Sequence, residues 1–331
     1  MRAATKSFLL FLALLAGAEL VVRVFFARGM SGRFEYGYHP TSGFVELPDG
    51  TVKLERTGGR KFFPQKFSHD RATNTFRIFV IGDSVPRGAS VAASYAGRLG
   101  ERLRAQGLAA ECYNLCLPGY GVRRKHLVLE QALNYQPSLI ISHVNDSNEY
   151  EDEREWRRRT EFQGWHPRNW LMKSLALRRF YEMKQEQIFW KWLPDTIRQQ
   201  RAANDADAHL QASLNDALAR EWSERVRTQT TADVALARSR GVPLLLIAHA
   251  TAELRADAVA NDNGLDALCT SLVGDGVAML SVKTTFAGQD MTKVYSDGSH
   301  LRPDSHDFLA QTIAVKLADL RWLPAPPAKN N

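Results

Sequence analysis

The sequence predicts an α/β protein in which helices cover both faces of a central parallel sheet of about five strands. The first observation is the stretch RIFVIGDSVPRGASV at 77–91, which is apolar at consecutive positions before Gly-Asp-Ser. A strand with this pattern is buried on both faces, which is typical of parallel sheets. The second observation is that such strands alternate with helical patterns along the chain, as in a three-layer α/β/α arrangement.

The elements of this domain follow one another from residue 77 onward. The predicted strands lie at 77–82, 110–116, 138–144, 242–250 and 276–282, and the predicted helices lie at 91–106, at 122–135, before Arg240 and at 304–319. Each strand is short and rich in apolar or β-branched residues, and each helix follows a turn signal. We therefore predict one domain over 77–320.

Two segments of different composition flank or interrupt this domain. Residues 27–76 are polar and rich in Gly, Pro and aromatics, with VELPDGTVKL predicting a hairpin about a Pro-Asp-Gly turn, and we expect this extension to pack on the main domain. Residues 146–230 break the strand and helix alternation and predict a helical insertion. The Pro-rich tail at 321–331 predicts disorder.

The insertion holds six of the seven tryptophans. Its segment 169–195, NWLMKSLALRRFYEMKQEQIFWKWLPD, is both aromatic and basic. Three interpretations remain open: an amphipathic helix on a membrane surface, a lid over the active site, or a helical insertion that buries its own aromatic face.

The N-terminus predicts a membrane anchor over residues 1–26. Arg2 and Lys6 precede FLLFLALLAGAELVVRVFF, whose nineteen residues span roughly 28 Å as a helix, close to the hydrocarbon thickness of a bilayer. Its Leu, Val and Phe residues favour insertion by about 6 kcal/mol, against up to about 3 kcal/mol for each of Glu19 and Arg23. Spacing of i, i+4 lets Glu19 and Arg23 pair on one helix face, which reduces this cost.

The competing interpretation of this segment is a signal peptide cleaved near Ala18, because Ala16-Gly17-Ala18 fits the small-residue cleavage pattern. We favour a retained single-pass anchor in the cytoplasmic membrane, because the apolar run continues past Ala18. Both interpretations place the rest of the chain outside the cytoplasm, in the periplasm or the extracellular space, either anchored or secreted.

Composition excludes several kinds of site. Three cysteines allow at most one disulfide, no His-Cys cluster has zinc spacing, and the acidic run DSNEYEDE lacks the glycine of a calcium loop. We therefore expect no metal and no cofactor. The net charge of +7 suits a membrane surface or a polyanion without demanding either, and we expect no nucleic-acid partner.

The candidate chemistry begins at the end of the first strand. Ligands bind beyond the carboxyl ends of parallel strands, so Ser84 in Gly-Asp-Ser is a candidate nucleophile. The alternative is that Asp83 or Ser84 only caps the following helix. A nucleophilic serine needs a base and an orienting carboxylate, and YSDGSHLRPDSH supplies Asp297 and His300 in a D-x-x-H spacing.

Two further strand ends carry groups that suit an oxyanion hole. YNLCLPGYGV places Gly119 after the second strand, where a glycine lets its backbone N–H approach a ligand closely. SHVNDSNEYEDE places Asn145 and Asn148 after the third strand, where a side-chain amide can donate to an oxyanion.

These four stretches, in this order, resemble the SGNH hydrolases, also called the GDSL esterase and lipase family. The resemblance covers roughly residues 77–145 and 230–320, and it implies the flavodoxin-like fold of that family with an esterase activity. It implies that Ser84 is the nucleophile, His300 the base and Asp297 the acid. It also implies an oxyanion hole made of the N–H groups of Ser84 and Gly119 and an asparagine amide.

The third block departs from the family pattern, which reads Gly-x-Asn-Asp or Gly-x-Asn-Glu. Both His143-Val144-Asn145-Asp146 and Asp146-Ser147-Asn148-Glu149 fit with the glycine replaced. Asn145 is the first choice because it is nearer the strand end, and Asn148 remains open. His143, His249 and His306 lack a carboxylate at D-x-x-H spacing, so we expect structural roles for them.

The function expected from these residues is that of a membrane-tethered serine esterase acting on O-acyl esters. The resemblance implies a cell-envelope polysaccharide as substrate, with a deacetylase or acetyltransferase reaction. The alternatives are a lipid esterase or lysophospholipase, suggested by the aromatic and basic insertion, and a binding or assembly factor that keeps the fold without turnover. No G-x-S-x-G elbow is present, which argues against the α/β-hydrolase superfamily.

Overall fold

The computed structural model describes residues 2–27, 38, 41–57, 60–161, 167–185, 194–196, 199, 216–261 and 263–324. The end of the predicted tail, part of the segment 169–195 and much of the predicted extension before residue 41 lie outside the described residues.

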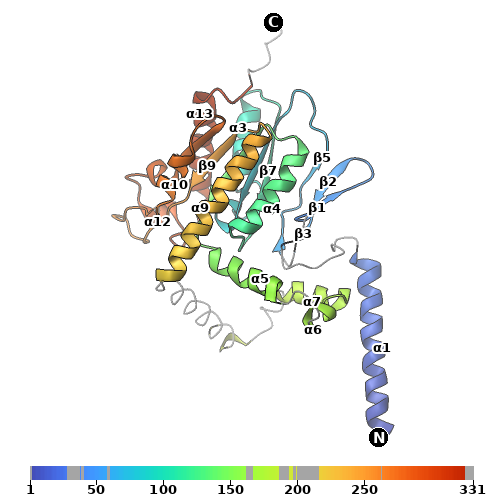
Figure 1. The fold of residues 1–331 in the computed structure, drawn as a ribbon. Coiled ribbons are helices and arrows are strands. Elements are labelled where there is room, and N and C mark those ends of the chain that lie inside the picture. The colour runs from blue at the N-terminus through green and yellow to red at the C-terminus, as the bar shows by residue number, and fades with distance from the viewer. Residues whose placement is uncertain are drawn as a thin grey trace.

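A five-stranded sheet with the order β10-β9-β8-β6-β7 forms the centre of the molecule (Figure 1). Its strands are β6 (Phe76–Gly82), β7 (Ala110–Cys116), β8 (Leu139–Val144), β9 (Leu244–Ala248) and β10 (Val277–Ser281). Every pair in it is parallel. Read from β7, the strands follow the order 2-1-3-4-5 along the chain, which is the flavodoxin-like arrangement. The predicted fold class is confirmed.

Helices cover both faces of this sheet. One face carries α3 (Tyr95–Ala105) and α13 (Pro303–Asp319), and the other carries α4 (Val122–Ala132), α9 (Asp216–Ser239) and α10 (Leu265–Leu272). The side chains of β6 alternate between these layers. Ile78 and Val80 pack in the cluster with α3 and α13, whereas Phe79 and Ile81 pack in the cluster with α4 and α9. All four are almost completely buried, which explains the continuous apolar run in the sequence.

The element boundaries differ from the predicted ones in a few places. The predicted helix at 91–106 begins at Tyr95, because the Ser94 side chain accepts a hydrogen bond from the Gly97 N–H and caps it there. The predicted helix at 122–135 ends at Ala132 and continues as a single 3₁₀ turn, Leu133–Tyr135. Helix α10 was not predicted from the sequence.

A small antiparallel sheet of β1 (Phe44–Glu46), β2 (Thr51–Leu54) and β5 (Lys66–Ser68) lies beside the main sheet. The predicted Pro-Asp-Gly hairpin is the β1–β2 pair. Aromatic side chains of this small sheet pack on the main domain. The ring centroids of Phe67 in β5 and Phe79 in β6 lie 5.3 Å apart, and those of Phe44 in β1 and Tyr135 lie 5.4 Å apart. A two-stranded ladder of β3 (Arg56–Thr57) and β4 (Arg60–Lys61) extends this region.

The remaining helices of the described residues lie at the carboxyl edge of the main sheet or toward the N-terminal end of the chain. They are α1 (Arg2–Phe25), α2 (Ser84–Arg87), α5 (Glu149–Glu161), α6 (Pro167–Leu171), α7 (Leu175–Gln185), α11 (Val282–Thr285) and α12 (Met291–Val294). Thr5–Phe25 of α1 is long and apolar enough to cross a membrane, and none of it is buried inside the molecule. In Figure 1, α1 extends away from the α/β domain on the side where α5, α6 and α7 lie.

Candidate active site

Ser84 is the first residue of α2, directly after the buried end of β6. The adjacent Asp83 caps this short helix, because its Oδ1 accepts a hydrogen bond from the Val85 N–H at 2.9 Å. The turn is tight: a Cβ on Gly82 would lie 2.3 Å from Pro86 Cγ and 3.2 Å from His143 Cβ. Only glycine fits there, so the glycine of Gly-Asp-Ser follows from the close contact of the turn with its own helix.

The structure brings Ser84, His300 and Asp297 together. The Ser84 Oγ lies 2.8 Å from His300 Nε2, and His300 Nδ1 lies 2.7 Å from Asp297 Oδ2. With the Nδ1 proton directed at the carboxylate, Nε2 is free to accept the proton of the serine hydroxyl. Both distances are within hydrogen-bond reach, so no rearrangement of these side chains is needed for proton transfer.

The Asp297 carboxylate is held as an anion. Burial raises the pKa of Asp297, but hydrogen bonds from the backbone N–H groups of His300 and Ser299 and from the His300 ring outweigh it, and the pKa ends below its usual value. Its Oδ1 accepts those backbone N–H groups at 2.8 and 3.1 Å. One carboxylate oxygen therefore orients the imidazole. The other oxygen is held by the backbone N–H groups of the turn.

The turn that carries this acid and base is fixed on the sheet. A Cβ on Gly298 would lie 2.5 Å from the Ala252 carbonyl oxygen, and the Gly298 carbonyl accepts the Ala252 N–H at 2.8 Å. The buried Tyr295 hydroxyl donates to the Ala250 carbonyl at 2.7 Å. These contacts join the turn to the segment after β9, so His300 is positioned by the same sheet that positions Ser84.

Asn145 and Asn148 both donate hydrogen bonds to Asp83, the residue directly before Ser84. Their Nδ2 atoms lie 2.9 and 2.8 Å from Asp83 Oδ2. Asn145 is buried, and its second amide hydrogen faces Ser147 Oγ at 2.8 Å. Asn148 is partly exposed, and its nearest second acceptor, the same Ser147 Oγ, lies 3.4 Å away. The second hydrogen bond of Asn148 is thus the longer and weaker one, so Asn148 is the amide more available to a ligand.

Asp83 makes contacts that the sequence did not predict beyond a helix cap. It is completely buried and accepts from Val85 N–H, Asn145 and Asn148. A carboxylate with three donors organises the loops after β6 and β8 around the serine. The signal in the sequence was the acidic residue directly before Ser84, with amide side chains after another strand end.

Gly119 lies in the turn after β7, and its φ of +71° favours glycine. A Cβ there would also lie 2.1 Å from Glu151 Oε2 and 2.7 Å from Arg60 Nη2. Its carbonyl accepts a hydrogen bond from the buried Arg124 guanidinium. Within the described part of the chain, the N–H groups of Gly119 and Ser84 have no hydrogen-bond partner, so both can donate to a ligand.

Three histidines lie beneath or beside this site with structural contacts. His143 Nε2 lies 3.2 Å from His249 Nδ1, and His306 Nδ1 accepts the Tyr95 N–H at 3.3 Å. Burial lowers the pKa of His249 and of His306 to about 4, and burial with the neighbouring His249 lowers the pKa of His143 well below its usual range. All three are therefore neutral at physiological pH. The His249 Nε2 has no partner among the described residues.

A buried ionic contact attaches the loop of Asn148 to the sheet domain. Helix α5 begins one residue after Asn148, and its Asp152 Oδ1 lies 2.6 Å from Arg124 Nε of α4, both side chains being at most 2% exposed. Glu149 Oε1 accepts the Val122 N–H at 2.8 Å. The Arg124 guanidinium thus connects α5 with the carbonyl of Gly119.

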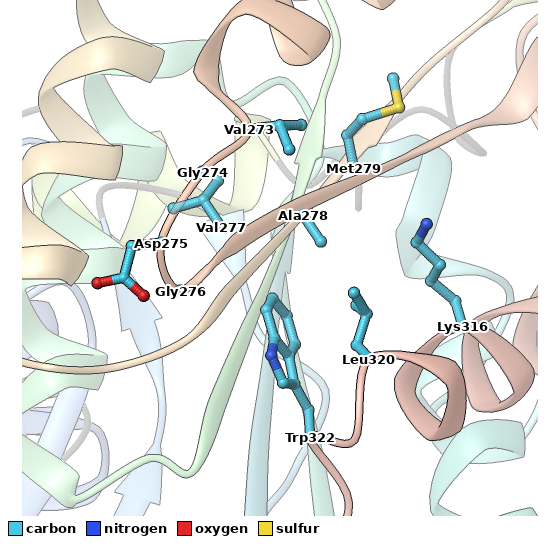
Figure 2. A pocket seen from close by; sticks show the side chains of 10 residues that line it. All are labelled: Val273, Gly274, Asp275, Gly276, Val277, Ala278, Met279, Lys316, Leu320 and Trp322. Carbon is cyan, nitrogen blue, oxygen red and sulfur yellow. The ribbon is translucent and has the colours of Figure 1, made fainter.

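A surface hollow of about 460 Å³ lies away from this site, at the start of β10 (Figure 2). Figure 2 shows Val273, Met279, Leu320 and Trp322 around it, with Lys316 at its margin. It lies at the amino end of an edge strand, whereas Ser84 follows the carboxyl end of a central strand. Among the described residues, no group of His, Cys, Asp and Glu side chains could hold a metal ion.

No family model matches the chain, and no curated protein matches its sequence. Several solved structures have a similar fold. The acetyl xylan esterase AlAXEase is 13% identical over 73% of this chain and 99% of its own, with a TM-score of 0.45. A putative acylhydrolase from Bacteroides fragilis is 10% identical over 76% of this chain and 90% of its own, with a TM-score of 0.42. AlinE4, an SGNH-hydrolase family esterase, is 15% identical over 77% of this chain and 100% of its own, with a TM-score of 0.38. The likeness is one of fold, and the chemistry proposed below rests on the side chains of this chain.

Proposed function

We propose that the chain is a serine esterase of the SGNH type that acts on O-acyl esters at a membrane. The observation that carries this proposal is the continuous contact from Ser84 Oγ to His300 Nε2 at 2.8 Å and from His300 Nδ1 to Asp297 Oδ2 at 2.7 Å. A hydroxyl, an imidazole and a carboxylate in this sequence of contacts form the arrangement that activates a serine for acyl transfer.

The first half of the reaction forms an acyl-enzyme. Ser84 Oγ attacks the ester carbonyl while His300 Nε2 takes the hydroxyl proton, and Asp297 stabilises the imidazolium that results. Collapse of the tetrahedral intermediate breaks the bond to the alcohol oxygen, which receives its proton from His300. The acyl group is then bound to Ser84 as an ester.

The second half releases the acyl group. A water molecule, or the hydroxyl of an acceptor, loses its proton to His300 and attacks the acyl carbonyl, and His300 returns that proton to Ser84. The product is a carboxylic acid when water attacks and a new ester when a hydroxyl attacks. The two reactions use the same groups and differ only in the acceptor.

The oxyanion formed in each half requires donors fixed in advance. We assign them to the N–H groups of Ser84 and Gly119 and to a side-chain amide. Asn148 is better suited than Asn145, because Asn145 has both amide hydrogens engaged at 2.9 and 2.8 Å. This assignment reverses the order of preference expected from the sequence, where Asn145 is nearer the strand end.

The substrate that suits this site is an ester on a large, hydrated carrier, such as an envelope polysaccharide. The side chains of His300 and Asp297 are 42% and 56% exposed, so the acid and base can be reached by an acyl group that projects from a bulky molecule. The apolar α1 would hold the enzyme close to such a carrier outside the cytoplasm, as the resemblance implies. A lipid ester is the second candidate, favoured by the exposed Trp170 and Phe180 of α6 and α7.

The experiment compares hydrolysis of p-nitrophenyl acetate by the full chain in detergent with that by Ser84→Ala and His300→Ala. Each substitution is expected to lower kcat/KM by about 10³-fold or more, because nucleophile and base act as a unit. Ser271→Ala, an exposed serine on α10, is the matched control and should leave the rate unchanged. Equal rates in the parent and Ser84→Ala, with both folded, would favour the alternative of a factor that binds without turnover.

A further inference from the structure

Glu19 of α1 pairs with Arg23 on its own helix and also contacts a second helix, α7. Arg23 Nη2 lies 2.8 Å from its Oε1, as the i, i+4 spacing predicts. The carboxylate also accepts hydrogen bonds from Ser174 Oγ at 2.7 Å, Leu175 N–H at 3.1 Å and Ala176 N–H at 2.9 Å. These groups form the N-terminus of α7, so an acidic side chain of the anchor caps a helix of the insertion.

This contact is favourable for both helices. The first backbone N–H groups of a helix have no partner within it, and a carboxylate at that end satisfies them and interacts favourably with the helix dipole. For α1, four donors compensate a charge that costs up to about 3 kcal/mol inside a membrane-spanning segment. Burying an acidic residue in an apolar anchor is thus explained by its role at α7.

The position of Glu19 sets the depth of α7. Glu19 lies six residues before Phe25, where the candidate membrane span ends, so it is about 9 Å along the helix from that end. An interfacial amphipathic helix buries its apolar face about 5–10 Å into the boundary between headgroups and acyl chains. The N-terminus of α7 therefore lies at the depth that such a face reaches when α1 spans the bilayer.

The surface of α6 and α7 suits that location. Trp170, Leu171 and Phe180 are 64%, 44% and 58% exposed, although they are large and apolar. The Arg179 guanidinium lies 5.6 Å from the Phe26 ring centroid, at the domain end of α1. Exposed aromatic side chains combined with arginines are typical of segments at a membrane interface.

We propose that α6 and α7 form a second membrane contact, which lies at the lipid headgroup boundary and is fastened to the anchor by the Glu19 carboxylate. Helix α5 begins one residue after Asn148 and precedes α6 in the chain, so this second contact would hold the carboxyl edge of the sheet toward the bilayer. Figure 1 shows α6 and α7 on the side of the α/β domain toward which α1 extends.

The test uses Phe180→Cys, labelled with an environment-sensitive fluorophore, in the full chain reconstituted into vesicles of phosphatidylcholine and phosphatidylglycerol. Val315→Cys, 56% exposed on α13, is the matched control. The native cysteines give little background, because Cys116 and Cys269 are buried and burial raises the pKa of Cys112 to about 12. Lipids carrying a nitroxide are expected to quench the fluorophore at position 180 several-fold and to leave the one at position 315 unquenched.

The Glu19 variants test whether the Glu19 carboxylate holds α7 against α1. Glu19→Ala should reduce the quenching at position 180 toward the control level while the chain stays in the vesicle, whereas Glu19→Gln should keep most of it, because an amide oxygen still accepts from α7. An unchanged unfolding midpoint of the α/β domain shows that the variant is folded. The proposal is overturned if position 180 is unquenched in the parent, whether its emission is that of water or of a protein contact, or if Glu19→Ala leaves the quenching unchanged.

Discussion

At the scale of single residues, Asp83 and Ser84 divide two roles that the sequence could not assign. Asp83 caps α2 and accepts from two asparagines, and this leaves the Ser84 hydroxyl for His300. The cap interpretation of Gly-Asp-Ser is therefore confirmed for Asp83, and the nucleophile interpretation stays a prediction for Ser84, whose hydroxyl contacts His300. Because the cap does not use the serine side chain, it leaves that hydroxyl available for the proposed chemistry.

The two asparagines give a prediction that compares their effects on kcat and on stability. Asn148→Ala is expected to lower kcat by on the order of 10²-fold, because it removes a donor to the oxyanion. Both substitutions leave buried Asp83 with one donor fewer, at about 1–3 kcal/mol of stability. Asn145→Ala is expected to lower kcat much less, because both of its amide hydrogens are engaged by Asp83 and Ser147. Steady-state kinetics and urea unfolding of both variants check this. A larger loss of kcat in Asn145→Ala than in Asn148→Ala, at equal loss of stability, would restore the first choice from the sequence.

The site was predictable from the sequence as far as residue types and strand ends determine it. Ser84, His300 and Asp297 were named from the Gly-Asp-Ser and D-x-x-H spacings, and the structure places them in contact. The choice between Asn145 and Asn148 was not predictable, because it depends on which amide hydrogens other acceptors occupy. That depends on Asp83 and Ser147, which contact them only after the loops have folded.

At the scale of elements, α5 is the helix of the insertion that lies next to the candidate site. It begins one residue after Asn148 and is attached to α4 by the buried pair of Asp152 and Arg124. The same guanidinium donates to the Gly119 carbonyl. Two of the proposed oxyanion donors therefore depend on one ionic contact between helices.

Breaking that contact is expected to be costly. Asp152→Asn leaves the Arg124 cation buried without its partner, and we expect it to lower the free energy of unfolding by about 3–5 kcal/mol. Glu253→Gln, which breaks an exposed pair with Arg255, is the matched control and should cost about 0.5 kcal/mol or less. Chemical denaturation of both variants measures the difference. Equal losses in the two would mean that the buried pair does not hold α5.

The elements themselves were predictable where their hydrophobic pattern was strong. The strands of the main sheet lie within about two residues of the predicted ones, since burial on both faces leaves a continuous apolar run. Helix α10 was missed because it is only eight residues long and has no side-chain cap at Gly264. The contacts of α7 were not predictable, because its N-terminal cap comes from Glu19, more than 150 residues earlier.

At the scale of the whole molecule, buried imidazoles make stability depend on pH. Burial lowers the pKa of His306 to about 4, against an ordinary value of 6.5. Between these values the unfolded chain binds the proton and the folded chain does not, so stability falls as the pH falls from about 6.5 to 4. Glu149 acts in the opposite direction, because burial and Asp152 raise its pKa to about 7. A comparison of the parent with a His306 variant therefore isolates the contribution of this histidine better than a single curve of stability against pH.

His306→Gln tests this dependence, because glutamine can still accept from the Tyr95 N–H but does not titrate. Between about pH 7 and pH 4.5 the parent is expected to lose on the order of 2 kcal/mol more than the variant. The advantage of the parent at neutral pH should shrink or reverse in acid. Urea unfolding at both pH values measures it, and parallel losses in the two chains would show that His306 is not buried in its neutral form.

In the proposed arrangement, the molecule joins the serine site to an apolar N-terminal helix that also contacts α7. The apolar α1 was expected from the sequence, and the structure contains one helix long enough to span a membrane. The proposed retained anchor would keep the Glu19 contact with α7, whereas cleavage near Ala18 would remove most of the helix that presents this carboxylate.

The most informative single measurement is the reaction of the full chain with a fluorophosphonate, followed by mass spectrometry of its peptides. We expect one adduct per chain, on Ser84, and about 10²-fold slower labelling in His300→Ala, because the phosphonate reacts only with a hydroxyl that a base activates. A folded chain that gains no adduct at Ser84, or that is labelled equally fast without His300, would contradict the proposed serine esterase.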